Sequence, residues 1–147
     1  MLVMRPAQIA DLSEVQRLAA DSPVGVTSLP NDAERLREKI AGSEASFAAE
    51  VSFNGEESYF FVLEDTDTGR LVGCSGIVAS AGYSDPFYSF RNETFVHASR
   101  ELKIHNKIHV LSLCHDLTGN SLLTSFYVQP ELVDTASAEL NSRARLL

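Results

Sequence analysis

The sequence has few cysteines, few basic residues and no long apolar segment, and each shortage excludes a class of protein. Its two cysteines, Cys74 and Cys114, do not support a disulfide framework. No apolar run approaches the roughly 18 to 20 residues that a membrane helix needs, so we expect no membrane partner. The 12 basic residues face 20 acidic ones, and the net charge of −8 disfavours a nucleic-acid partner. Because the N-terminus also lacks an apolar signal core after a basic stretch, we expect a soluble cytoplasmic protein.

What the sequence does contain is enough for one folded domain. Its 147 residues are 44% hydrophobic and 22% charged, which excludes disorder and coiled coil. A short apolar segment over residues 2–5 predicts a first strand. Asp11, with Glu14 three residues later, predicts the start of a helix that ends before Pro23. Asn31 or Asp32 can cap a second helix.

The middle of the sequence predicts β-structure. Residues 59–63 and 71–78 read as a hairpin around the turn 65–69, and the small residues of the second strand suggest that something packs closely against its backbone. We expect 80–91 to be irregular. Further β segments of the sheet are expected at 108–113 and 122–128.

From Pro130 the composition is helical as far as Leu147. No glycine or asparagine follows the final Leu146-Leu147, so the helix ends apolar and uncapped. We therefore expect residues 1–147 to be a single domain fragment of a longer protein, truncated at its C-terminus.

The predicted order of elements is strand, helix, helix, hairpin, strand, strand and helix. This order resembles the beginning of the acyl-CoA N-acyltransferases of the GNAT superfamily, as do Arg5-Pro6-Ala7 and the hairpin. The resemblance implies an α/β fold, the N-terminal half of a GNAT-like domain, with a mixed, mostly antiparallel sheet flanked by helices.

The same resemblance implies where an acyl-CoA would bind. In the superfamily a splayed strand pairs with the pantetheine arm, and the following helix offers its N-terminal amides to the pyrophosphate. Here these are the strand 122–128, with a bulge expected over 126–128, and the helix after Pro130. The implied residues that bind the acyl-CoA co-substrate are Phe126, Tyr127, Val128, Ala136, Ser137 and Ala138.

Four separate motifs narrow the resemblance to one family, arginine N-succinyltransferase. They are Thr27-Ser28-Leu29-Pro30, Phe61-Val62-Leu63-Glu64-Asp65, Val96-His97-Ala98-Ser99 and Asp116-Leu117-Thr118-Gly119-Asn120-Ser121. The resemblance covers essentially the whole chain and points to the N-terminal part of the α-type subunit. It implies transfer of succinyl from succinyl-CoA to the α-amino group of L-arginine, or of ornithine, in arginine catabolism. It implies a paralogous partner subunit and no permanently bound cofactor. The fragment alone is expected to be inactive.

One segment departs from the superfamily pattern. The pyrophosphate loop usually begins with a basic or amide residue and contains glycines, whereas residues 133–138 here read Val-Asp-Thr-Ala-Ser-Ala. Asp134 adds a charge that repels phosphate, and Ala136 replaces a glycine that allows close approach. Two alternatives therefore remain open, a non-catalytic partner subunit and another amine N-acetyltransferase.

Other candidate sites are weaker, and we predict no metal site and no catalytic residue within the chain. The turn 65–69 is similar to the start of a calcium loop but lacks the glutamate at position twelve. His105 and His109 lie too far apart on a strand to share one ion. His97 is the best titratable candidate. The carboxylates available to an arginine substrate are Glu64, Asp85, Glu93 and Asp116.

Overall fold

The structure is a computed structural model that describes residues 1–53 and 55–146. The chain separates into two compact units, one comprising Met1–Ser80 together with the segment from Ser121, and the other comprising Ala81–Asn120. The expectation of one domain over the whole chain stays a prediction. The strands are β1 (Leu2–Pro6), β2 (Ser58–Asp65), β3 (Arg70–Val78), β4 (Ser89–Ser99), β5 (Ile104–Cys114) and β6 (Leu122–Val128). The α-helices are α1 (Leu12–Asp21), α2 (Ala33–Ala48) and α3 (Ala136–Arg143).

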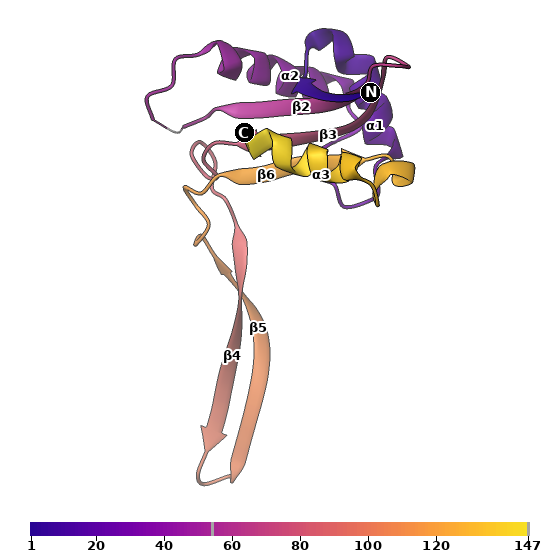
Figure 1. Cartoon of the computed structure of the whole chain (residues 1–147). Coiled ribbons are helices and arrows are strands. Elements are labelled where there is room, and N and C mark those ends of the chain that lie inside the picture. The colour runs from indigo at the N-terminus through magenta and orange to yellow at the C-terminus, as the bar shows by residue number, and fades with distance from the viewer. Residues whose placement is uncertain (54, 147) are drawn as a thin grey trace. The chain divides into compact units, whose positions relative to one another are not determined.

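The first unit is built on a four-stranded sheet in the order β1-β2-β3-β6 (Figure 1). Each neighbouring pair is antiparallel, so the expected antiparallel sheet flanked by helices is confirmed. The hairpin between β2 and β3 turns at Gly69, whose φ of +69° is the left-handed conformation that favours glycine. The turn predicted over residues 65–69 is therefore confirmed.

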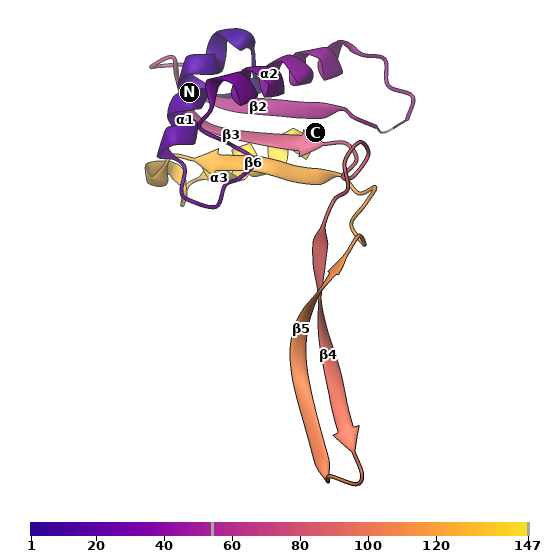
Figure 2. The same cartoon turned by 180° about the vertical axis from the view of Figure 1, so that it is seen from behind.

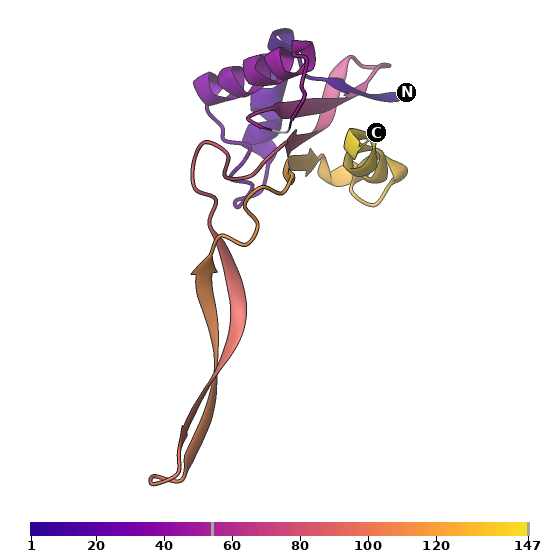
Figure 3. The same ribbon diagram turned by 90° about the vertical axis from the view of Figure 1, so that its left-hand side faces the viewer.

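Helices cover both faces of this sheet. Helices α1 and α2 lie on one face (Figure 2), and α3 lies on the opposite face (Figure 3). Side chains alternate along the strands, so Phe60 and Val62 of β2 point towards α1 and α2 and are fully buried. None of the helices that the structure describes is long and apolar enough to cross a membrane.

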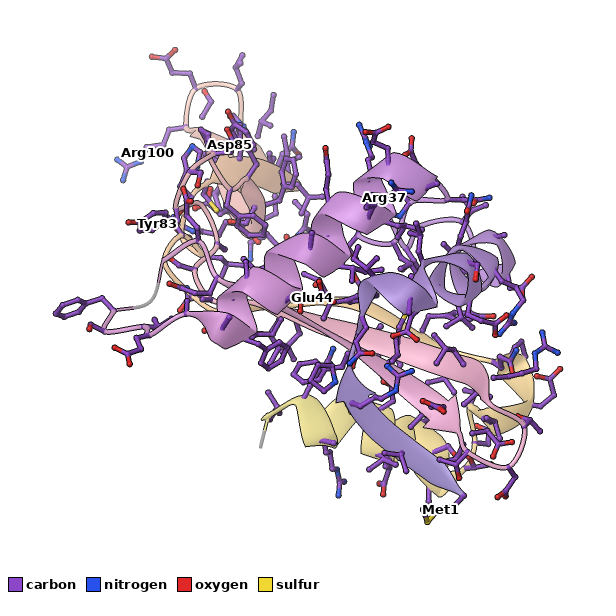
Figure 4. All side chains as sticks on the ribbon, turned by 90° about the horizontal axis from the view of Figure 1, so that it is seen from above. Met1, Arg37, Glu44, Tyr83, Asp85 and Arg100 are labelled. Atoms are coloured by element: carbon purple, nitrogen blue, oxygen red, sulfur yellow. The ribbon has the colours of Figure 1, made fainter. Side chains whose placement is uncertain are left out.

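The core lies between the sheet and the pair α1 and α2. The apolar stripes of the two helices meet the sheet there, and burying each such side chain contributes about 1.5–3 kcal/mol. The central residues are Val15, Leu18, Leu36, Ile40, Phe60, Val62 and Cys74. The opposite face of α2 carries exposed charges such as Arg37, labelled in Figure 4.

Both helices start where the sequence predicts, but only one start is capped by its side chain. Asp32 caps α2, because its carboxylate accepts from the amides of Glu34 and Arg35 at 2.9 and 3.0 Å. Asp11 is the N-cap residue of α1, but its side chain makes no capping hydrogen bond to that helix. Its carboxylate accepts from Arg5 and from the amide of Gln8, and the turn Ile9–Asp11 is already a 3-10 helix.

The second unit contains a two-stranded antiparallel ribbon of β4 and β5, paired from Ser89 with Cys114 to Ser99 with Ile104. Both faces of the ribbon carry exposed apolar side chains, with Phe90 and Leu113 paired on one face and Phe95 and Ile108 paired on the other. A two-stranded ribbon is only marginally stable alone.

Three predictions for the C-terminal half were wrong. The segment 108–113 is part of β5 and pairs with β4 instead of joining the sheet. Residues 89–91, expected to be irregular, begin β4. The helix expected from Pro130 is broken into a 3-10 turn over Pro130–Leu132, helix α3 and a further 3-10 turn over Ala144–Leu146. Thr135 starts α3 anew, because its hydroxyl accepts from the amide of Ser137.

Candidate functional site

Strand β6 contains a bulge at its centre. Cys74 of β3 pairs with Tyr127 and Gly76 pairs with Thr124, so that the single residue Ser75 faces two residues of β6. Those two are Ser125 and Phe126. The bulge expected in this strand is thus present, with its first residue one position earlier than predicted. Within the described chain β6 pairs only with β3, so its outer edge is open.

Ser125 is held in an uncommon backbone conformation. Its φ is +53°, and such left-handed geometry costs a non-glycine residue of order 1–3 kcal/mol. Three hydrogen bonds fix it: its amide donates to Ser28 Oγ at 2.8 Å, its hydroxyl donates to the Ser28 carbonyl at 2.8 Å, and its carbonyl accepts from Cys74 Sγ at 3.3 Å. The loop between α1 and α2 therefore fixes the bulge from one face.

Asn141 fixes the bulge from the other face. This α3 side chain is fully buried, and its Nδ2 donates to the carbonyls of Cys74 and Tyr127, both at 3.0 Å. These two carbonyls belong to the strand pair next to the bulge. The Asn141 carbonyl also accepts from Ser75 Oγ at 3.1 Å. Helix α3 is thus attached by polar contacts at the point where the ladder is interrupted.

The small residues of β3 allow this close approach. A Cβ added to Gly73 would lie 2.8 Å from the Tyr127 carbonyl oxygen, and one added to Gly76 would lie 2.9 Å from Thr124 Oγ1. The prediction that something packs closely against this backbone is confirmed, and what packs there is β6.

A pocket of about 270 Å³ lies beside the bulge. It is almost entirely apolar, and three elements line it: the loop after α1, the bulged half of β6, and the segment leading into α3. The lining residues are Pro23, Val26, Phe126, Tyr127, Val128, Pro130, Val133 and Ala138. An apolar pocket beside an open strand edge can accept an extended ligand that pairs with the main chain.

The start of α3 is less open to an anion than the resemblance implies. The amides of Val133 and Thr135 donate to the carbonyls of Pro130 and Leu132, and the amide of Ala138 donates to the Thr135 carbonyl. The amide of Ser137 donates to the Thr135 hydroxyl. Several of the donors that a phosphate would use are therefore already occupied.

The structure gathers most of the predicted acyl-CoA residues in one place. Phe126, Tyr127, Val128 and Ala138 line the same pocket. Ala136 and Ser137 begin α3 nearby but are not lining residues. Their role in binding stays a prediction.

Sequence reasoning missed the two residues that hold the site, Ser28 and Asn141. Ser28 occurs in a quoted motif but without a role. Asn141 could have been singled out from the sequence, since asparagine has a low helix propensity and its presence inside a helix suggests that its side chain makes specific hydrogen bonds.

The carboxylates considered for a guanidinium substrate are mostly engaged within the protein. Glu64 accepts from Arg5 Nε at 2.6 Å. Glu93 and Asp116 both accept from Arg91, at 3.2 and 2.6 Å. Asp85 is exposed in the second unit.

The remaining candidates are not among the residues that line the pocket. His97 is exposed on β4, opposite Asn106. Cys74 is buried beneath the bulge, and burial raises the pKa of its thiol to about 12, so it is no nucleophile. Among the described residues, no group of three or more His, Cys, Asp or Glu side chains is placed to hold a metal ion.

Comparison with known proteins assigns the chain to a family. The family described as "Arginine N-succinyltransferase beta subunit" matches residues 2–147. The chain is 84% identical, over its whole length, to arginine N-succinyltransferase subunit alpha of Pseudomonas aeruginosa. It is 39% identical over 146 residues to subunit beta of the same organism.

A solved structure shares the fold. The structure titled arginine/ornithine succinyltransferase subunit AI from Pseudomonas aeruginosa superposes with a TM-score of 0.92 at 84% identity, over 99% of this chain and 44% of that one. The chain spans 44% and 42% of the lengths of the two curated subunits.

Proposed function

The chain belongs to the arginine N-succinyltransferase family, and from this we propose that it is the N-terminal part of a subunit that transfers succinyl from succinyl-CoA to the α-amino group of L-arginine. The observation that carries the proposal is the 84% identity to the alpha subunit over all 147 residues. Ornithine is a second acceptor in the proposal, because the solved relative is named for both amino acids.

In this proposal the bulge of β6 is where the succinyl-CoA arm binds. Its pantetheine amides would pair with the open edge of the strand as an added strand does. Phe126 and Val133 would contact its apolar parts in the pocket beside the bulge. The fixed left-handed Ser125 keeps the edge in one conformation, so the ligand need not order it on binding.

The reaction needs a neutral amine and a proton for the leaving thiolate. No described residue of the pocket lining is a histidine or a carboxylate. We therefore place the acid and base groups outside this lining and name no catalytic residue within it.

We propose that the subunit acts with a paralogous partner in the cytoplasm. A family with both an alpha and a beta subunit in one organism supports the partner. Two free cysteines, Cys74 and Cys114, fit a reducing compartment.

The test is an activity assay of the natural-length subunit, with and without its paralogue. We expect L-arginine to be succinylated from succinyl-CoA and acetyl-CoA to be a poor donor. Transfer from acetyl-CoA at an equal rate would indicate an amine N-acetyltransferase instead.

A second candidate, a supporting subunit that does not itself bind succinyl-CoA, is favoured by the start of α3. Its amides are partly occupied, and Val133 and Asp134 are exposed where the superfamily has phosphate-binding residues. At 4–6 Å and an effective dielectric of ~20, Asp134 would cost a bound phosphate roughly 3–4 kcal/mol before screening.

Loop variants decide between the two candidates. The four substitutions Val133→Arg, Asp134→Lys, Ala136→Gly and Ala138→Gly should tighten succinyl-CoA binding to the subunit alone at least tenfold, as measured by calorimetry. Micromolar binding by the unmodified subunit, unchanged by the substitutions, would identify this subunit as the catalyst.

A further inference from the structure

Arg145 is a buried cation that has no anionic partner among the described residues. The residue is only 8% exposed, and it lies in the 3-10 turn after α3. Its Nε donates to the Ser142 carbonyl at 3.1 Å, whereas Nη1 is buried and has no hydrogen-bond partner. Across residues 1–53 and 55–146 no carboxylate forms an ion pair with this guanidinium.

Such a group is costly unless something neutralises it. Burial alone lowers the pKa of Arg145 from its usual value. The guanidinium carbon lies 5.5 Å from the centre of the Phe126 ring, and a cation–π contact of this kind offsets only part of the desolvation penalty of a buried charge. A guanidinium in this setting can form charge-assisted hydrogen bonds with the carboxylate of a ligand.

Arg145 lines a second pocket of about 550 Å³, on the face of the sheet that carries α3. The sheet contributes Tyr59, Phe61 and Leu123, and Phe47 from the end of α2 packs edge-on against both aromatic rings at 5.0 and 5.6 Å. Among the described lining residues, the guanidinium is the only cation and the others are uncharged. A pocket of this kind suits a ligand with a short apolar body and one carboxylate.

The position of Arg145 relates this pocket to the bulge. Helix α3 returns antiparallel along β6, so that Val133 lies near the end of the strand and Arg145 near its start. Phe126 lines the pocket at the bulge and also faces the guanidinium. An arm that pairs with the β6 edge from the α3 start would thus have its acyl end directed towards Arg145.

We propose that Arg145 binds the carboxylate of a small ligand in this pocket and that this ligand is the succinyl group of the acyl donor. The identification of the ligand rests on the proposed function, whereas the carboxylate site does not. Arg145 then selects a donor with a free carboxylate over one that ends in a methyl group, because only the former offers an anion to the guanidinium.

The binding test uses the natural-length subunit, with free succinate as the probe and succinamide as its uncharged control. We expect calorimetry to show at least tenfold tighter binding of succinate than of succinamide, and Arg145→Met to abolish that preference. Arg143→Met is the matched control, since Arg143 lies two residues away with a side chain that is 76% exposed, and it should leave the preference intact.

Thermal denaturation separates this role from a structural one. Arg145→Met removes an unpaired buried charge, so it should leave the melting temperature unchanged or raise it. If a carboxylate from another segment or subunit already pairs with Arg145, succinate will not bind and the variant will melt lower, which would overturn the proposal.

A kinetic experiment tests the identity of the ligand. Arg145→Met should lower kcat/KM for succinyl-CoA at least tenfold relative to acetyl-CoA. If succinate binding depends on Arg145 but no succinyl transfer to arginine occurs, the carboxylate site stands and the proposed function fails. If succinyl transfer occurs and Arg145→Met leaves donor preference unchanged, the proposed function stands and the assignment of the ligand is wrong.

Discussion

Asn141 is expected to determine whether α3 stays attached to the bulged strand. Its Nδ2 satisfies two buried carbonyls, those of Cys74 and Tyr127, while its own Oδ1 is buried without a partner. Asn141→Ala removes one hydrogen bond from each of these carbonyls, and each such bond contributes about 0.5–1.5 kcal/mol to stability. The substitution also removes the buried, unpaired Oδ1 atom, which offsets about one of these two losses of free energy. The net loss should be about 2–3 kcal/mol, including the small cavity that the substitution creates.

For a chain of this length, each kcal/mol corresponds to about 2–4 °C in melting temperature. Asn141→Ala should therefore melt roughly 5–10 °C below the parent chain when unfolding is followed by circular dichroism. Arg143→Ala is the matched control on the same helix, because Arg143 makes only an exposed pair with Glu139. It should shift the melting temperature by less than about 2 °C, as exposed pairs contribute little.

Asn141→Asp gives the sharper test, because it keeps the shape of the side chain and replaces the Nδ2 donor by a carboxylate oxygen that can only accept hydrogen bonds. An ionised carboxylate facing two carbonyls should cost more than the alanine substitution at pH 7. Burial and the two carbonyls raise the pKa of this carboxyl in the folded state, so its destabilisation should lessen as pH falls and the acid becomes a donor. A variant as stable as the parent at pH 7, or an alanine variant within 0.5 kcal/mol of it, would refute the role assigned to Asn141.

Three further predictions follow from burial and charge. Cys74 should resist alkylation at pH 8 in the native chain while Cys114 reacts, as measured by mass spectrometry. Burial raises the pKa of the Cys74 thiol to about 12. The neutral thiol should therefore contribute fully to the stability of the fold below about pH 9, and this contribution should decline towards pH 12. Asp11→Asn should cost about 1 kcal/mol at neutral pH, since Arg5 lowers the pKa of the Asp11 carboxyl, and the difference should vanish in denaturant titrations as pH falls through that lowered pKa. Amides of the ribbon β4 and β5 should exchange with solvent at least ~100-fold faster than those of β2 and β3 in the chain alone, and equal protection would contradict the marginal stability inferred for the ribbon.

Periodicity predicted the parts of the fold that local sequence controls. Val15, Leu18, Leu36 and Ile40 form part of the core, because side chains three or four positions apart lie on the same face of a helix. The turn at Gly69 followed from its need for a positive φ. These features require no knowledge of what lies across the sheet.

The ribbon could not be predicted in the same way. The segment 108–113 is apolar enough for an interior strand, and its pattern predicts a strand of the sheet. In the structure its partner is β4, with apolar residues exposed on both faces of the pair. Strand pairing depends on the partner, which a local pattern does not specify.

The bulge depends on contacts that are distant in sequence, and this explains why the resemblance predicted it and the residues alone did not. Ser125 reaches its left-handed conformation because Ser28, 97 positions away, accepts its amide hydrogen and receives its hydroxyl hydrogen. Asn141 meets Cys74 across 67 positions. A strained backbone conformation of this kind persists only where several surrounding contacts hold it in place. Such conformations occur frequently at binding sites. Since both restraints act on β6 from opposite faces of the sheet, buried polar groups keep the ladder between β3 and β6 interrupted. A strand needed only for packing would gain stability from an unbroken ladder, so this cost supports the proposal that a ligand pairs with the open edge of β6.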